Sequence, residues 1–446
     1  MKATVINMAE PMDQAGTVAS GGEGRTPDQK KSPVSSPSPG NRRLSFGRKR
    51  SLAEDTLIFR EPLHPETGGK GERVVRGSID MTFLLIVLGL LLFGIIMAYS
   101  ASSIYAEKSL GDSAYYIKRH LLFIFLAVVV TIPFVVLAQP WMWRFFAVCS
   151  YLVSIGLLLL VLLIGTSRGE AQRWIVLGPI TIQPSEIAKV AVVMMLSLLM
   201  SRYEKQIMSE QRFGGSFKYG VLMPGACMGV ILLLVAAEKH ISGVMIIAMI
   251  GAMVMLMGGT RLRYLLIIGG VVAVGGVLLI AFSSYAGTRL DIWLRIDEMN
   301  PLGEAWQTLQ GLYAIGSGGL FGLGLGNSRQ KFGYISEPQN DFIFSIICEE
   351  LGFFGAVAVL LLFALLLWRG FQIASGAPDR FCALTVYGIV FKAALQAVLN
   401  IAVVTNSMPN TGISLPFFSS GGTALMIQIF EMGIVLNISR FSRVKK

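Results

Sequence analysis

The residues that decide the fold are Asn340–Gly352, with the sequence NDFIFSIICEELG. They open an apolar run that continues to residue 368, longer than the roughly 20 residues that a helix needs to cross a bilayer. Three carboxylates nevertheless lie within them: Asp341, Glu349 and Glu350. Because an unpaired charge inside a bilayer costs about 3 kcal/mol or more, this stretch predicts a membrane helix whose acids have partners or a function. For Asp341, the alternative is a capping role in the first helical turn, where the macrodipole favours an anion.

The composition of the whole chain is that of a polytopic membrane protein. Of its 446 residues, 53% are hydrophobic and 15% are charged, whereas soluble domains average roughly 45–50% and 25%. We predict an all-α polytopic fold with about ten transmembrane helices and a long extracytoplasmic loop between spans 7 and 8. The predicted spans are residues 81–101, 120–138, 145–165, 185–201, 219–237, 241–258, 264–282, 341–368, 381–404 and 422–438.

The basic residues predict the orientation of the chain in the membrane. Lys and Arg cluster near the N-terminus, in alternate short connections and in the C-terminal RFSRVKK. Cytoplasmic connections carry such an excess, so both termini are predicted in the cytoplasm and the longer loops outside. The formal net charge of +11 is therefore a topology signal, and we predict no nucleic-acid-binding surface.

The domain organisation follows from the same patterns. Residues 1–78 are rich in Ser, Gly, Pro and charge and lack apolar periodicity, and such segments do not bury enough apolar surface to fold. We predict that they form a disordered basic cytoplasmic tail. The ten-helix membrane domain is predicted over 79–440, with 283–340 as its large extracytoplasmic loop, and 441–446 as a short basic cytoplasmic tail.

The four cysteines give no sign of a disulfide framework or a zinc site. They lie in or beside apolar runs without a CxxC pair, at Cys149, Cys227, Cys348 and Cys382. Small core residues are the role that this placement favours.

Several predicted spans contain further charged residues. Lys189 lies in the fourth span, three residues after Glu186, so the two share a helix face. Lys392 lies in the ninth span and Glu431 in the tenth. Both lysines are candidate partners for the two deeper acids of NDFIFSIICEELG. A structural ion pair between helices is an equal alternative for Lys392, and we assign Glu431 a structural role.

Residues 314–330, AIGSGGLFGLGLGNSRQ, contain six glycines. Backbone N–H groups of such a run are able to cradle a phosphate, but the spacing matches neither nucleotide-binding glycine motif. An anion site and a close-packed re-entrant turn therefore remain equal alternatives.

Two other predicted external segments place polar residues beside Pro or Gly directly before a span. They are QRWIVLGPITIQPSE at 172–186 and PNTGISLPFFSSGGTAL at 409–425. At membrane depth, irregular backbone is tolerated where it lines a cavity or is buried in protein. Together the two segments predict a polar cavity that is open to the outside.

Taken in their order along the chain, these motifs resemble those of the SEDS family (shape, elongation, division and sporulation), which includes FtsW, RodA and SpoVE. The resemblance covers about residues 80–440. It rests on RWIVLGPITIQPSEIAK at 173–189, EKHISG at 238–243, the segment from AIGSGG to GFFG at 314–355, and LPFFSSGGTAL at 415–425.

The resemblance implies an inverting peptidoglycan glycosyltransferase of the bacterial cytoplasmic membrane, which joins lipid II units at the outer face during division or septal wall synthesis. The family's catalytic Asp falls on Asp341, which would act as the general base. The implied cofactor is a divalent cation, Mg or Mn, with Asp341 as a candidate ligand. Class B penicillin-binding transpeptidases and other division proteins are the implied partners. The residues assigned to substrate or pyrophosphate binding are Lys189, Glu186, Arg173, Lys392 and Ser420.

Three positions depart from the family pattern. Gln339-Asn340 replaces the usual His-Thr, Ser420 stands in the place of a tyrosine, and EKHISG stands where many members have PDLGT. The reactive carboxylate is retained, while hydrogen bonds from its usual neighbours are not implied.

Two other functions stay open at this point. Charged residues within the spans also suit a transporter that flips the lipid-linked precursor, although the motifs cluster outside and not at broken mid-membrane helices. A non-catalytic scaffold of the division machinery is the third alternative.

Overall fold

The computed structural model describes residues 72–168, 171–178, 180–209, 215–271, 284–300, 302–303, 305–336, 338–419 and 422–445. The predicted N-terminal tail lies outside this part of the chain up to residue 71. Within it, eight helices are long and apolar enough to cross a membrane: α2 (Met81–Leu110), α3 (Tyr115–Leu137), α4 (Pro140–Ile164), α5 (Pro184–Arg202), α7 (Met223–Ala237) with the preceding π-helical turn η3 (Lys218–Leu222), α12 (Ile343–Ser375), α13 (Arg380–Val404) and α14 (Gly422–Ser439).

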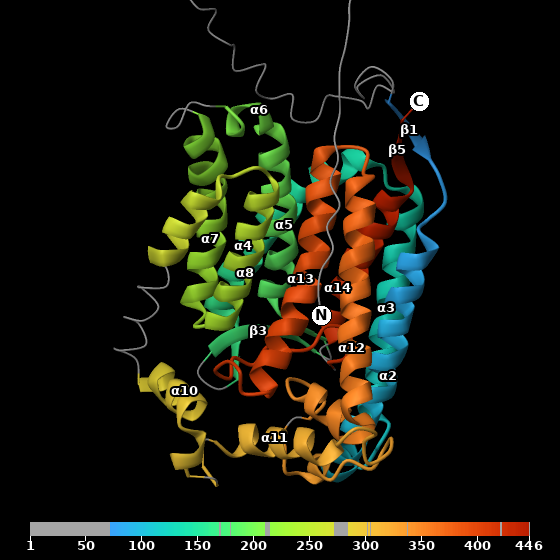
Figure 1. Cartoon of the computed structure of the whole chain (residues 1–446), viewed down its shortest axis with the longest axis vertical. Helices are drawn as coiled ribbons and strands as arrows, with labels where there is room; N and C mark the ends of the chain where they lie inside the picture. Colours follow the sequence, from blue (N-terminus) through green and yellow to red (C-terminus); the bar gives the residue numbers. More distant parts are fainter. Residues whose placement is uncertain are drawn as a thin grey trace, which may run out of the picture. The chain divides into compact units, whose positions relative to one another are not determined.

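Of two shorter apolar helices, α8 (Ile241–Met257) falls within the sixth predicted span and Leu262–Val271 overlaps the start of the seventh. The helices stand side by side as a bundle (Figure 1). The predicted all-α polytopic membrane fold is confirmed.

One end of the bundle, which we call the α11 end, carries most of the irregular structure (Figure 1). The elements there are α10 (Ser284–Leu294), η4 (Ile296–Glu298), α11 (Trp306–Gly318), η5 (Gln330–Phe332) and the antiparallel sheet of β2 (Thr166–Arg168), β3 (Ala171–Leu177) and β4 (Ile180–Ile182). The predicted loops 166–184 and 283–340 thus contain ordered elements.

The opposite end, which we call the β1 end, carries α6 (Glu204–Ile207) and a two-stranded ribbon (Figure 1). In the ribbon, β1 (Glu72–Arg76) pairs antiparallel with β5 (Phe441–Lys445). Residues 72–76 belong to the segment whose composition predicts disorder. The structure instead gives their backbone groups partners in the C-terminal strand, which a composition argument does not consider.

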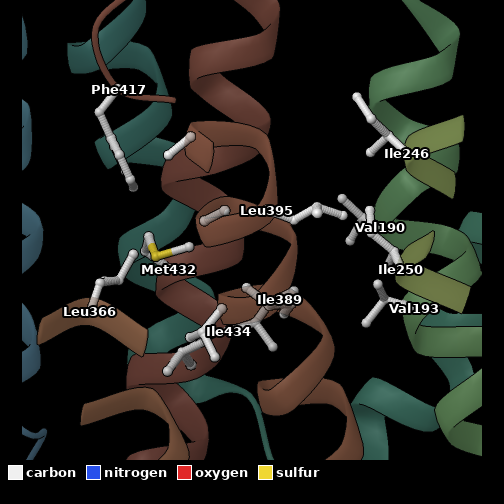
Figure 2. Close-up of a cluster of buried hydrophobic side chains, with 14 of the residues drawn as sticks. Val190, Val193, Ile246, Ile250, Leu366, Ile389, Leu395, Phe417, Met432 and Ile434 are labelled. Atoms are coloured by element: carbon white, nitrogen blue, oxygen red, sulfur yellow. The ribbon is translucent and has the colours of Figure 1, made fainter. Parts of the chain in front are cut away.

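The core lies between α8 and the three most buried spans, which are α5, α13 and α14. Figure 2 shows Val190 and Val193 of α5 in one group with Ile246 and Ile250 of α8, and Ile389 of α13 near Ile434 of α14. Met432 and Ile434 of α14 belong to the same buried cluster. Lys189 of α5, Lys392 of α13 and Glu431 of α14 are each at most 3% exposed, so they lie in the protein interior and not against lipid.

Candidate active site

The helix that begins after Asp341 is interrupted, and the glycine-rich segment supplies hydrogen-bond donors to the carbonyl groups at the interruption. Within α12, Gly352 has φ 65° and ψ −159°, a backbone conformation that is open essentially to glycine alone. The N–H groups of Leu323 and Gly324 donate to the carbonyl groups of Glu349 and Glu350, at 2.9 and 3.0 Å. These donors supply the carbonyls next to the break, so they are not available to a phosphate.

The glycines also allow the two backbones to touch. A Cβ on Gly318 would lie 1.9 Å from the Cys348 carbonyl oxygen, and one on Gly322 would lie 2.1 Å from that of Glu350. Real Cβ atoms do not approach so closely. Of the two alternatives for residues 314–330, the contacts therefore favour the close-packed turn.

The two deeper acids are fully satisfied by the connection that follows this turn. The Glu349 carboxylate accepts hydrogen bonds from the Ser328 hydroxyl and from the Arg329 N–H, the latter at 2.8 Å. The Glu350 carboxylate accepts from the Ser100 hydroxyl of α2 and forms an ion pair with Lys331 at 2.8 Å. The predicted cation is present, and buried acids with such partners are structural.

The identity of that cation corrects the sequence prediction. Lys189 and Lys392 were the candidate partners of the α12 acids, and this was wrong. Lys189 Nζ lies 2.7 Å from Glu186 Oε1 within α5, and Lys392 of α13 pairs with Glu431 of α14. Each lysine thus pairs with an acid on its own helix or on a neighbouring core helix, and its charge is already balanced there.

Glu186 and Lys392 line one small, partly open cavity. Gln396 and Gln428 contribute further polar groups to its wall, and residues 414–417 with Ser419 form another part. The structure thus brings together the fourth span, the ninth span and the segment 409–425, which the sequence predicted to border a polar cavity. Ser420 lies outside the described residues.

Asp341 lies beside the same segment, nearer to its start. Phe342 is the N-cap of α12 and its side chain makes no capping hydrogen bond, so the capping alternative for Asp341 stays a prediction. The Asn400 side-chain N–H groups donate to the Asp341 carbonyl and to the Ile413 carbonyl, both at 2.7 Å. A Cβ on Gly412 would lie 3.3 Å from Asp341 Oδ2. One segment, 410–419, therefore contacts Asp341 at its start and lines the cavity further on.

Arg173 of β3 forms a second group of charges with the turn between α7 and α8. Burial raises the pKa of Glu238 to about 8, against the pull of Arg173. Burial, together with the positive charges of Arg173 and Lys189, lowers the pKa of His240 to about 4. Within the described chain, neither Glu238 oxygen nor Arg173 Nε has a hydrogen-bond partner. With a pKa of about 8, the Glu238 carboxyl is mostly neutral at pH 7 and does not balance the charge of Arg173.

Sequence reasoning did not single out Lys331, Asn400 or Gly412. Asn400 was detectable in principle, because a polar side chain in an apolar span usually has a role. Lys331 and Gly412 lie in polar segments where neither residue type is unusual.

Comparison with known proteins identifies the family. The family model described as "Cell cycle protein", which is named for FtsW, RodA and SpoVE, matches residues 81–444. The chain belongs to this family. The FtsW–RodA–SpoVE relatives include stage V sporulation protein E of Bacillus subtilis, 39% identical over 369 residues, which are 82% of this chain and 98% of the relative. Another is the probable peptidoglycan glycosyltransferase FtsW of Trichlorobacter lovleyi, 37% identical over 362 residues, which are 81% and 93%.

Solved structures of the family share the fold. A chain from a structure of a peptidoglycan synthase complex that coordinates polymerization and crosslinking matches with a TM-score of 0.65 and 25% identity, over 81% of this chain and 98% of that chain. The rod shape determining protein RodA of Thermus thermophilus matches with a TM-score of 0.59 and 24% identity, over 81% and 97%. The SEDS resemblance of the sequence is thereby confirmed, with FtsW-like relatives.

Proposed function

We propose that the chain is a peptidoglycan glycosyltransferase that polymerises lipid II into glycan strands at the outer face of the bacterial cytoplasmic membrane, during cell division or septal wall synthesis. Asp341 acts as the general base. The observation that carries the proposal is the placement of Asp341 against the segment 410–419, whose later residues line the polar cavity with Glu186 and Lys392. The names of the relatives as peptidoglycan glycosyltransferases support the reaction class.

The chemistry needs one base and a place for a departing pyrophosphate. The acceptor hydroxyl gives its proton to the Asp341 carboxylate as its oxygen attacks the anomeric carbon of the donor sugar. The bond from that carbon to the pyrophosphate oxygen breaks, and its electron pair leaves with the pyrophosphate. Glycoside hydrolases use a second carboxylate to protonate the leaving group. A pyrophosphate is already a stable anion and instead needs positive charge.

Arg173 is the strongest source of that charge. Lys189 and Lys392 each have an acidic partner, so each pair is close to neutral overall. Arg173 forms none of the ion pairs seen among the described residues, and burial raises the pKa of its neighbour Glu238 to about 8. We assign Arg173 to the pyrophosphate, and Lys189, Glu186 and Lys392 to the shape and polarity of the cavity.

A divalent cation, Mg or Mn, is part of the proposal. In the described residues, no three His, Cys, Asp or Glu side chains gather as a metal site. Mg²⁺ is often held by one or two carboxylates together with substrate phosphates, and Asp341 with the pyrophosphate fits that pattern. Such an ion would supply positive charge to the leaving group.

The positive-inside pattern supports an orientation with the α11 end outside and both termini in the cytoplasm. At the β1 end, Arg369 pairs with Asp80, Arg144 with Asp379, and Arg380 with Glu204. Arginine-rich connections mark the cytoplasmic side. Asp341 then faces the outer leaflet, where a lipid-linked sugar and a class B penicillin-binding transpeptidase would meet it, along with other division proteins.

The decisive experiment compares purified wild type with Asp341→Asn on lipid II and a divalent cation, with products separated by size. Asp112→Asn is the matched control, because Asp112 is a second carboxylate at the α11 end whose ion pair with Lys118 is exposed. We expect glycan chains from wild type and Asp112→Asn, and none from Asp341→Asn. Chains of normal length from Asp341→Asn would exclude Asp341 as the base.

A transporter is the second candidate function. Paired charges beside a cavity also suit a polar route through the bundle, and two such pairs are Lys189–Glu186 and Lys392–Glu431. Vesicles that contain Asp341→Asn separate the two functions. Translocation of the lipid-linked precursor without glycan product would favour the transporter. Normal growth with Asp341→Asn as the sole copy would favour a scaffold.

A further inference from the structure

The segment 410–413 is held in place by three separate elements. The Ser242 hydroxyl of α8 donates to the Thr411 carbonyl, and Arg289 of α10 donates to the Asn410 carbonyl. Asn400 of α13 donates to the Ile413 carbonyl at 2.7 Å. A loop whose carbonyl groups are bound in sequence by different elements is fixed in position, which is the property that a substrate-positioning surface needs.

The fixed loop presents a glycine to the Asp341 carboxylate. Gly412 is exposed and has φ +66°, in the left-handed region that favours glycine. A Cβ at this position would lie 3.3 Å from Asp341 Oδ2. Any side chain at this position would therefore stand in contact with that carboxylate oxygen, and glycine avoids this contact.

The remaining residues of the segment connect Gly412 to the cavity. Residues 414–417 and Ser419 line the cavity with Glu186 and Lys392, and in the proposed reaction this cavity takes the donor. Residues 410–413 lie at the other end of the same segment, where Gly412 is exposed and the Thr411 hydroxyl is buried without a hydrogen-bond partner among the described residues. The segment thus runs from the exposed Gly412 beside Asp341 to the residues that line the cavity.

We propose that residues 410–413 form the acceptor-binding surface, on which the acceptor sugar lies, and that the absence of a side chain at Gly412 lets the acceptor hydroxyl reach Asp341. This inference rests on the proposed function, in which Asp341 takes the hydroxyl proton. Asn400 is a positioning residue in this scheme, because it joins the backbone of Asp341 directly to that of Ile413. The ligand class is a sugar with a free hydroxyl group.

Gly412→Ala tests the surface, with Gly178→Ala as its matched control. Gly178 lies in the β3–β4 turn with φ +60°, and a Cβ there would meet no atom within 4 Å. Both substitutions place alanine in a left-handed conformation, so their backbone strain is alike. Only Gly412→Ala places a methyl group beside Asp341.

We expect Gly178→Ala to polymerise lipid II at the wild-type rate and Gly412→Ala to be slower by about tenfold or more, because a small displacement of reacting groups costs that much. Binding of labelled lipid II, dominated by the donor cavity, should be unchanged in Gly412→Ala. Gly412→Asn is the second variant, because asparagine tolerates the left-handed region better. It should fold and be at least as slow.

The outcomes separate the two proposals. If wild type polymerises and folded Gly412→Asn matches its rate, the acceptor surface is overturned while the glycosyltransferase stands. Equal losses in Gly412→Ala and Gly178→Ala would also overturn it, since strain alone would then explain both. If folded wild type makes no polymer, the glycosyltransferase proposal itself fails.

Discussion

Lys331 Nζ lies 2.8 Å from Glu350 Oε1, and neither side chain is more than 2% exposed. The same ammonium group donates to the Gly326 carbonyl at 2.6 Å and to the Ser100 hydroxyl at 3.3 Å. The pair therefore joins α2, α12 and the connection that leads to Asp341. The deeper acids of NDFIFSIICEELG hold that connection against the broken helix.

Removal of the lysine should be costly. We expect Lys331→Met to destabilise the fold by about 3 kcal/mol or more, because it leaves a buried carboxylate without its cation. Glu350→Gln added to Lys331→Met should recover part of that loss, since the amide carries no charge. Thermal unfolding in detergent measures both.

The control for this prediction is Lys118→Met. Lys118 also forms an ion pair at 2.8 Å, with Asp112, but its side chain is 69% exposed. An exposed pair contributes about 1 kcal/mol or less. Equal effects of Lys118→Met and Lys331→Met would contradict the structural role of the buried pair.

Two glycines of α11 should respond in opposite ways to alanine. A Cβ on Gly318 would strike the Cys348 carbonyl, whereas one on Gly316 would meet no atom within 4 Å. We expect Gly316→Ala to be neutral or stabilising by up to about 1 kcal/mol, from helix propensity. Gly318→Ala should destabilise, because the two backbones must separate. A stable, fully active Gly318→Ala would contradict the close packing of residues 314–330.

The sequence predicted the membrane fold well because hydrophobicity over about 20 residues is a local property. The pairing of Glu186 with Lys189 was equally accessible, since residues three apart share a helix face. The family was accessible too, because short motifs and their order are properties of the chain itself.

Pairings between distant segments were not accessible in the same way. Lys331 and Glu350 are brought together by the break at Gly352 and the turn around it, and no periodicity encodes that geometry. The contact of Gly412 with Asp341 depends on three elements that hold residues 410–413. Such contacts come from tertiary packing, so the sequence did not identify Lys331 as the partner of Glu350 and offered Lys189 and Lys392 in its place.

The pair Lys392–Glu431 permits a test of whether Lys392 binds substrate or only holds helices together. Both side chains are at most 2% exposed, so Lys392→Met alone should destabilise by about 3 kcal/mol or more. In the double variant Lys392→Met/Glu431→Leu, no charge remains unpaired and stability should return. Restored stability with restored polymerisation would assign a structural role. Restored stability without polymerisation would show that the cavity needs the charge, and we expect this second result because Lys392 lines the cavity.

The pH dependence of stability should change when Glu238 becomes glutamine. Its carboxyl group has a pKa of about 8 in the folded protein, raised by burial from the ordinary 4.5. Between these two values the folded state binds more protons than the unfolded state, so this group makes the protein less stable as pH rises from 4.5 to 8, with no further change beyond. His240, with its pKa lowered by burial to about 4 from 6.5, acts in the opposite direction and only below pH 6.5. As the pH rises from 6.5 to 8, wild type should therefore lose stability relative to Glu238→Gln, as measured by thermal unfolding.

The same titration should appear in the rate of polymerisation. Above pH 8 the wild-type rate should decline, because ionised Glu238 neutralises Arg173, whereas Glu238→Gln should retain its rate. Polymer formed from lipid II at a series of pH values measures both. A stability difference that does not vary with pH would show that Glu238 is already ionised at neutral pH, and Arg173 would then lose its place as the charge for the pyrophosphate.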